Sequence, residues 1–281
     1  MTAGAIVMAG ASPIGWVQLA SGEPLSAGYA AFETSPETAA KVRAMIERHA
    51  EIDAAVMPAH LFGRKRLLIS DMDSTIIGQE CIDELADAVG LKPQISEITE
   101  RAMRGELDFE AALTSRVAML RGLPLVELDR TLRERITLNP GARTLIATMK
   151  AHGAQTLLVS GGFTFFTSRV AQLAGFASHQ GNTLIDDGAA LTGEVGQPIL
   201  GRAAKRTALL EAAAAFGAGP EDAIALGDGA NDLDMIKAAG LGIAYHAKPV
   251  VAAEAAASIR HTDLTAALFF QGFTAAQFVH G

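Results

Sequence analysis

Short runs of apolar, β-type residues alternate with helical segments from residue 67 to the end of the chain. The runs are LLIS at 67–70, TLLVS at 156–160, AIALG at 223–227, LGIAY at 241–245 and the weaker SIRH at 258–261. Strands that are apolar throughout are typical of a parallel sheet covered by helices on both faces. The pattern therefore predicts an α/β fold built on a Rossmann-like parallel sheet.

A long helical insertion separates the first two of these strands. Apolar residues recur at helical spacing within residues 82–89, and Gly90 follows as a stop signal. Asp108 is a suitable N-cap for a second helix, whose apolar positions begin at Phe109. The insertion is too long for a simple crossover, so we expect a helical cap at about 77–136, inserted after the first core strand.

Two other stretches fall outside this alternation. Extended runs on both sides of Asp187-Gly188 predict a small hairpin near residues 182–196. Residues 1–64 contain Gly- and Ala-rich extended segments around one helix signal, Ser35-Pro36-Glu37 followed by KVRAMIERH. The basic GRKR at 63–66 is either a domain junction or a solvated turn. We predict a small N-terminal α+β section at 1–64 and one larger domain at 65–281.

Charge and cysteine content narrow the possible partners. The 281 residues carry a formal net charge of −8, whereas nucleic acids and anionic membranes are bound by clustered Lys and Arg, so we expect neither partner. The single cysteine, Cys81, excludes an internal disulfide. Neither a signal-peptide pattern nor an uncharged run of 18 apolar residues occurs. We therefore expect a soluble, cytoplasmic protein, and the oligomeric state stays open.

Three polar clusters follow three of the predicted strands. DMDST begins at residue 71, SGGF at 160 and GDGAND at 227. Each cluster alone is explained by helix caps and turns. In an open parallel sheet, however, ligands bind at the carboxyl ends of the strands, so three such clusters are expected to converge. Their joint occurrence predicts one site.

The paired acids of DMDST indicate a cation. A calcium loop starting at Asp71 would need glycine at its sixth position, where Ile76 stands, and no dinucleotide or P-loop fingerprint occurs. A Mg²⁺ ion held by carboxylates remains, with Asp71 and Asp228 as suitable ligands. Such an ion accounts for one acid of the pair, and does not explain why two are needed.

Phosphoryl transfer explains the second acid. Asp71 could attack phosphorus, while Asp73 could protonate the leaving oxygen and later activate water. The negative charge that develops on the phosphoryl oxygens needs donors around it. The candidate donors are Ser160, the backbone N–H groups around Gly161 and Gly162, and Lys205, which alone would be interpreted as a solvated helix residue.

Together, DMDST, SGGF, Lys205 and GDGAND resemble the four ordered motifs of the haloacid dehalogenase (HAD) superfamily of phosphatases. The setting of these motifs, across residues 67–270, is similar to the phosphoserine phosphatase family of that superfamily. The resemblance implies a HAD-like core with Asp71 as nucleophile and Asp73 as acid/base. The other roles that it implies are Mg²⁺ ligation by Asp71, the Asp73 carbonyl and Asp228, support of the metal by Asp232, and phosphate positioning by Asn231.

The cap carries the expectation about the substrate. The family has an acid soon after its first motif and an arginine in a later cap helix, matched here by Glu80 and Arg116. Glu80 would face the substrate ammonium and Arg116 its carboxylate, although both could be exposed helix charges. Met103 and Phe109 match apolar positions that line the family's pocket. The expected reaction is hydrolysis of the small molecule O-phosphoserine to serine and phosphate, the last step of serine biosynthesis.

Three alternatives remain open from the sequence. The first is a phosphatase or phosphotransferase of the same superfamily that acts on another small phosphate ester. The second is a receiver-like signalling module with a long-lived phosphoaspartate, which Asp73 disfavours because a built-in base favours turnover. The third is amino-acid sensing by residues 1–64, because family members of this length often carry an ACT-like domain there. This section shows only a degenerate ACT-like pattern.

Overall fold

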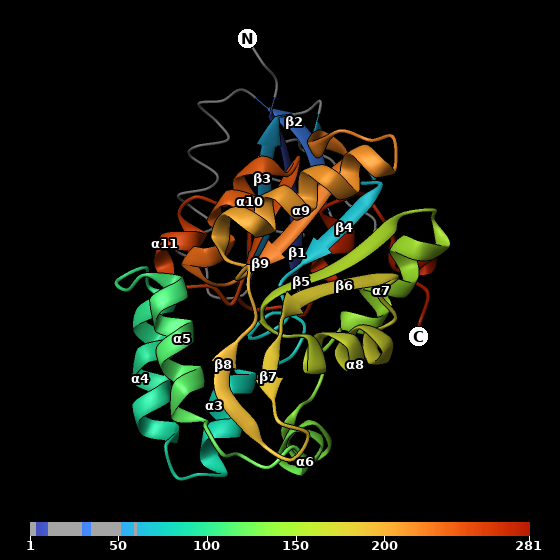
Figure 1. The fold of residues 1–281 in the computed structure, drawn as a ribbon. Coiled ribbons are helices and arrows are strands. Elements are labelled where there is room, and N and C mark those ends of the chain that lie inside the picture. Colours follow the sequence, from blue (N-terminus) through green and yellow to red (C-terminus); the bar gives the residue numbers. More distant parts are fainter. Residues whose placement is uncertain (1–3, 11–29, 35–51, 59–60) are drawn as a thin grey trace.

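The computed structural model describes residues 4–10, 30–34, 52–58 and 61–281 (Figure 1). Within these residues the main sheet has nine strands, in the order β2-β1-β3-β11-β10-β9-β4-β5-β6. The last six are parallel to one another: β11 (Ala257–Ile259), β10 (Leu241–Tyr245), β9 (Ala223–Gly227), β4 (Leu67–Ser70), β5 (Gln155–Phe163) and β6 (Ser178–Asn182). The predicted α/β fold is confirmed.

Helices cover both faces of this parallel sheet. Leu67 and Ile69 of β4 point to the face covered by α9 (Arg202–Ala215) and α10 (Leu233–Ala238). Leu68 points to the opposite face, where the helices are α7 (Ala142–Ala151), α8 (Thr164–Ala174) and α12 (Ala266–Phe269). Because successive strand residues alternate between two buried faces, the central strands are apolar at every position.

The cap is built from helices that follow β4. They are α3 (Cys81–Asp87), α4 (Lys92–Met103), α5 (Phe109–Met119) and α6 (Val126–Arg135). The predicted hairpin is β7 (Leu184–Asp186) with β8 (Leu191–Val195), and Leu191 exchanges backbone hydrogen bonds with the chain just after α5. Figure 1 shows the cap helices and the hairpin together below the sheet. The cap inserted after the first core strand is thus confirmed.

The strands of the N-terminal section extend the same sheet. They are β1 (Gly4–Gly10), β2 (Ala30–Thr34) and β3 (Ile52–Pro58), and β3 pairs antiparallel with β11. The buried carboxylate of Asp53 accepts hydrogen bonds from the backbone N–H groups of Arg260, His261 and Thr262, at 2.8, 3.1 and 2.8 Å. The helix predicted after Ser35 lies outside the described residues. The division at residue 64 remains a prediction.

Several smaller elements complete the fold. The GRKR segment is packed rather than solvated at Lys65, whose Nζ donates to the carbonyls of Leu61 at 2.6 Å and Glu221 at 3.0 Å. The short helix α11 (Pro249–Ala252) lies between β10 and β11. None of the helices in the described part of the chain has the length and apolar character needed to cross a membrane.

Candidate active site

The turn after β4 presents Asp71 and Asp73 to one pocket. Between them Met72 is buried in the core, and its carbonyl accepts the backbone N–H groups of residues 75–77. Oδ1 of Asp71 accepts the N–H of Met72 at 2.7 Å. Because the apolar side chain between them is fixed in the core, the two carboxylates are held on the pocket side of the turn.

Asp73 is anchored from both sides of the pocket. Its Oδ1 accepts the backbone N–H of Cys81, at the start of α3, at 2.9 Å, and its Oδ2 accepts the hydroxyl of Ser160 at 3.3 Å. Burial raises the pKa of Asp73 above its ordinary value. The raised pKa favours a protonated carboxyl group, which can donate a proton before it accepts one.

Lys205 is fully buried and joins two acids. From α9 its Nζ lies 2.8 Å from Oδ2 of Asp71 and 2.6 Å from Oδ1 of Asp232. Burial alone would lower the pKa of Lys205, but attraction to Asp232 and Asp71 outweighs it and raises the pKa. The lysine therefore carries a permanent positive charge beside Asp71.

Three buried carboxylates, those of Asp71, Asp228 and Asp232, each offer an oxygen within 4.8 Å of the others. Burial and then Asp232 raise the pKa of Asp71 to about 8, and burial raises that of Asp228 well above its ordinary value. One lysine thus does not neutralise the cluster, and a divalent cation fits it.

The two acids on the GDGAND loop are bonded differently. Both oxygens of Asp232 are engaged, Oδ1 by Lys205 and Oδ2 by the backbone N–H groups of Asp228 and Gly229 at 3.1 Å. Among the described residues, the carboxylate of Asp228 accepts one hydrogen bond, from the Thr75 hydroxyl at a long distance of 3.3 Å. The carboxylate of Asp228 is therefore the freer of the two, because both oxygens of Asp232 are already bonded.

The SGGF segment forms a cradle at the end of β5. Oγ of Ser160 accepts the N–H of Gly162 at 2.8 Å, and a Cβ on Gly162 would lie 2.6 Å from Oδ2 of Asp73. A Cβ on Gly161 would lie 2.5 Å from the Phe109 ring. Close approach by the backbone therefore requires glycine at both positions.

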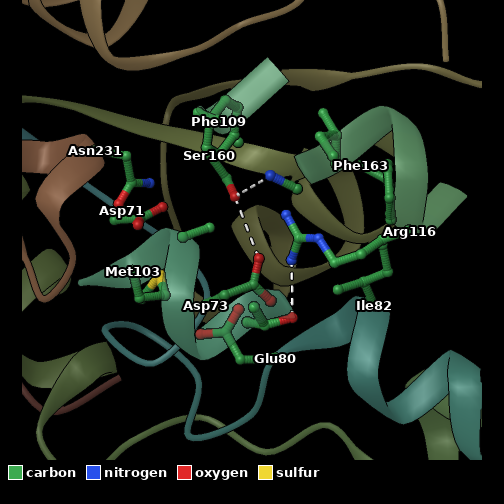
Figure 2. A pocket seen from close by; sticks show the side chains of 15 residues that line it. Asp71, Asp73, Glu80, Ile82, Met103, Phe109, Arg116, Ser160, Phe163 and Asn231 are labelled. Carbon is green, nitrogen blue, oxygen red and sulfur yellow. Dashed lines mark hydrogen bonds between the residues drawn. The ribbon is translucent and has the colours of Figure 1, made fainter. Parts of the chain in front are cut away.

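Asn231 completes this end of the pocket. Its Oδ1 is one of only two buried side-chain nitrogen or oxygen atoms among the described residues that have no hydrogen-bond partner. A buried polar atom without a partner is costly, so this amide is suited to a ligand that the pocket receives. Figure 2 shows Asn231 beside Asp71.

Glu80 and Arg116 enter the same pocket from the cap (Figure 2). Oε1 of Glu80 accepts the Ser74 hydroxyl at 2.5 Å, and burial raises the pKa of Glu80 well above its ordinary value. Arg116 is 5% exposed, and no carboxylate of the described residues lies within ion-pair distance of it. Burial lowers the pKa of Arg116, and the nearby charge of Glu80 opposes that shift. The buried arginine is therefore available to an anionic ligand.

Most residues singled out in the sequence line this one pocket. They are Asp71, Asp73, Glu80, Met103, Phe109, Arg116, Ser160, Gly161, Gly162 and Asn231. Lys205, Asp228 and Asp232 are not among the residues that line this pocket, but Lys205 pairs with Asp71 and Asp232, and Asp228 belongs to the same acidic cluster. The convergence predicted from three separate loops is observed, while the roles of the individual residues are taken up as a proposal below.

Sequence reasoning missed two polar side chains in the cap. Thr99 is 4% exposed and Asp83 9% exposed, and Thr99 accepts a hydrogen bond from Arg116. The IDEL and ITER segments that contain them look like ordinary helix surfaces. The only available signal was their position within helices whose neighbours carry Glu80 and Arg116, and it does not specify a contact.

Known proteins share this architecture. The family model of haloacid dehalogenase-like hydrolases matches residues 65–240. The chain is 49% identical over 204 residues to the phosphoserine phosphatase of Albidiferax ferrireducens, covering 71% of this chain and 86% of the relative.

Two solved structures are also similar. A HAD family hydrolase from Salmonella enterica serovar Typhi has a TM-score of 0.83 and 31% identity, covering 95% of this chain and 98% of that one. A phospho-aspartyl intermediate analogue of a phosphoserine phosphatase has a TM-score of 0.69 and 38% identity, covering 73% and 98%. The chain therefore belongs to the haloacid dehalogenase-like hydrolases and, within them, to the phosphoserine phosphatase family.

Proposed function

We propose that this chain hydrolyses O-phosphoserine to serine and phosphate through a phospho-Asp71 intermediate. The observation that carries the proposal is a single pocket lined by Asp71 and Asp73 from the core and by Glu80 and Arg116 from the cap. The two core acids suit reaction at a phosphoryl group, and the two cap residues have the charges that an α-amino acid requires. The relatives named phosphoserine phosphatase support this substrate.

The first half-reaction transfers the phosphoryl group to the protein. A carboxylate oxygen of Asp71 attacks phosphorus as the bond from phosphorus to the seryl oxygen breaks, and Asp73 gives its proton to that oxygen. Lys205, the Ser160 hydroxyl and the N–H groups of the SGGF cradle stabilise the charge on the phosphoryl oxygens. Serine leaves with an intact hydroxyl group.

The second half-reaction returns Asp71 to its starting state. The Asp73 carboxylate removes a proton from water as the water oxygen attacks phosphorus and the bond to Asp71 breaks. Phosphate is released, and Asp73 is protonated again. The anchoring of Asp73 to Cys81 and Ser160 supports both steps, because the same carboxyl group has to face the leaving oxygen and then the water.

Mg²⁺ is the cofactor that we propose for this acidic site, with Asp71 and Asp228 as side-chain ligands, the Asp73 carbonyl as a third and Asp232 as support. When bound, Mg²⁺ would neutralise the facing negative charges and polarise a phosphoryl oxygen. We prefer magnesium because all the proposed ligands are oxygen atoms, which suit a hard cation. Cytoplasmic location and the absence of nucleic-acid or membrane partners stay predictions.

Specificity is tested by removing the charges at the cap end. Arg116→Ala should lower kcat/KM for phosphoserine by about 2 to 4 kcal/mol, roughly 30- to 1,000-fold, because it breaks a desolvated charge pair. Phosphoethanolamine, which lacks the carboxylate, should be affected far less. Glu80→Gln should penalise esters that carry an ammonium more than p-nitrophenyl phosphate.

Arg101→Ala is the matched control, because Arg101 lies on cap helix α4 but its side chain is 44% exposed. It should leave all three substrates unchanged. Equal losses on every ester in Arg116→Ala would assign that residue to cap structure and favour a phosphatase for another small phosphate ester.

A further inference from the structure

We infer that Thr99 and Asp83 are positioning residues that aim Arg116 at the substrate carboxylate. The inference rests on the proposed function, which places a carboxylate at the cap end of the pocket. Asp83 lies on α3, Thr99 on α4 and Arg116 on α5, so the three side chains link three cap helices. All three are buried.

The hydrogen bonds between them run in one direction. Nη1 of Arg116 lies 2.9 Å from Oγ1 of Thr99, and a guanidinium can only donate, so the threonine hydroxyl accepts. The single hydroxyl proton must therefore go elsewhere. Its two acceptors are Oδ1 of Asp83 at 2.7 Å and the carbonyl of Ile95 at 3.0 Å. Asp83 is the nearer, and its charge makes it the stronger acceptor.

Arg116 is thus fixed at two points. Its Nε donates to the carbonyl of Ala112, one turn earlier on α5, at 3.2 Å, and its Nη1 donates to Thr99. Two of its five N–H groups are used, which leaves the remainder for a ligand. Figure 2 shows the guanidinium pointing into the pocket, on the side of Ser160 and Asp73.

Thr99 also keeps Arg116 apart from nearby acids. The charges of Glu80, Asp83 and Asp73 all act on the guanidinium, yet none of these residues forms an ion pair with it in the described chain. Without the hydroxyl between them, Arg116 could turn to Asp83 and form an internal pair. That pair would compete with the substrate carboxylate for the same donors.

The test compares Thr99→Val with Thr99→Ser on phosphoserine and phosphoethanolamine. Loss of one hydrogen bond to a charged group predicts a rise in KM for phosphoserine of about 10- to 100-fold in Thr99→Val, with little change in kcat. Phosphoethanolamine should change by less than about 2-fold. Thr99→Ser keeps the hydroxyl and should restore the wild-type KM.

Thr131→Val is the matched control, because Thr131 is a buried threonine on cap helix α6 that does not line the pocket. It should leave both KM values unchanged. Asp83→Asn should have a smaller effect than Thr99→Val, because the Ile95 carbonyl and the new amide oxygen can still take the hydroxyl proton. If Thr99→Val does not fold, Thr99→Ala replaces it in the comparison of KM values with Thr99→Ser.

A double-mutant cycle separates positioning from packing. Thr99→Val should add no further loss for phosphoserine in an Arg116→Ala background, because its effect acts through that arginine. Additive losses, equal losses on the two esters, or an unchanged KM in Thr99→Val would each overturn the inference. If Arg116→Ala loses much more activity on phosphoserine than on phosphoethanolamine, the proposed function stands even when the inference about Thr99 fails. If Arg116→Ala loses equal activity on the two esters, both the proposed function and the inference about Thr99 fail.

Discussion

Nζ of Lys205 lies 2.8 Å from Oδ2 of Asp71, and neither side chain has more than slight contact with solvent. The lysine comes from α9, more than a hundred residues after the strand that precedes the aspartate. It therefore couples two helix–strand units of the core at the residue proposed to attack phosphorus. The same ammonium group also holds Asp232, so the nucleophile and the GDGAND loop share one counter-charge.

Lys205→Met should inactivate the enzyme and destabilise it. Removing one partner of a buried ion pair leaves an uncompensated charge and costs about 3 to 5 kcal/mol in the free energy of unfolding. Lys237→Met is the control, because the Lys237–Glu254 pair is about half exposed and such pairs contribute about 0 to 1 kcal/mol. Thermal melts and kcat/KM of both variants check this. Wild-type activity in Lys205→Met would remove the lysine from the site.

Asp71→Asn and Asp73→Asn should fail at different steps. The amide of Asp71→Asn cannot attack phosphorus, so neither turnover nor a phosphoprotein should be detectable. Asp73→Asn keeps the nucleophile but loses the proton transfers, each contributing roughly 10²- to 10⁴-fold. Mass spectrometry of the acid-quenched protein and steady-state rates distinguish the two. A phosphoprotein in Asp71→Asn would contradict the covalent route.

The metal-free protein should lose stability as the pH rises from about 5 to 8. The folded chain keeps a proton on Asp71 up to its raised pKa of about 8, whereas the unfolded chain has lost that proton above the ordinary value of 3.8. The unfolded state then binds fewer protons, so titration of Asp71 alone makes unfolding easier by up to about 1.4 kcal/mol per pH unit. Asp73, Glu80 and Asp228, whose pKa values are also raised, act in the same direction. Melts in chelator across this range measure the slope.

Saturating Mg²⁺ should reverse or flatten that slope, because a cation favours the ionised carboxylates and its affinity rises with pH. Asp71→Asn in chelator should also have a shallower slope, since it removes one of the titrating groups. A melting temperature that rises from pH 5 to 8 in chelator would contradict the raised pKa of Asp71.

Alanine at the two cradle glycines should separate binding from chemistry. Gly162→Ala would push its Cβ against Asp73 and should lower kcat by about 100-fold, as expected for a misplacement of about 1 Å. Gly161→Ala meets the ring of Phe109 on cap helix α5, so the cap would sit further out and KM should rise more than kcat falls. The same kinetic defect in both variants would show that the cradle acts as one unit.

Asp53→Ala should destabilise the protein by about 2 to 4 kcal/mol, because it leaves three partly buried backbone N–H groups without an acceptor. Below the melting temperature kcat should be unchanged, since Asp53 does not line the pocket. Asp129→Ala, at a half-exposed position on α6, is the control. If the N-terminal section folds independently, the rest of the protein should instead keep its stability in Asp53→Ala and after removal of residues 1–64.

The short apolar runs along the sequence were enough to predict the central strands of the core sheet, because each of these strands has to be apolar on both faces. They missed β6, whose sequence is SHQGN and whose first three residues are exposed, because an edge strand needs no apolar run. Strand order was equally out of reach, since β4 pairs with β5 and β9, which come much later in the chain.

Motif spacing predicted which loops would converge, and the structure brings them together. It did not predict the burial of Lys205, which has the sequence context of a surface helix and is 0% exposed. It also missed the link from Asp83 through Thr99 to Arg116, because that contact depends on how three helices pack. Contacts between elements that are distant in sequence have no signature within either element.

The pairing of β3 with β11 has a consequence for how the protein is made. Strands β1, β2 and β3 leave the ribosome before the other strands of the main sheet and can pair with one another at once. Their neighbour in the main sheet, β11, is synthesised after all the other strands of that sheet. At typical translation rates the outer edge of β3 waits roughly 10 to 40 seconds for its partner. During that interval an unpaired edge is open to other nascent chains, so chaperone demand should be concentrated early in translation.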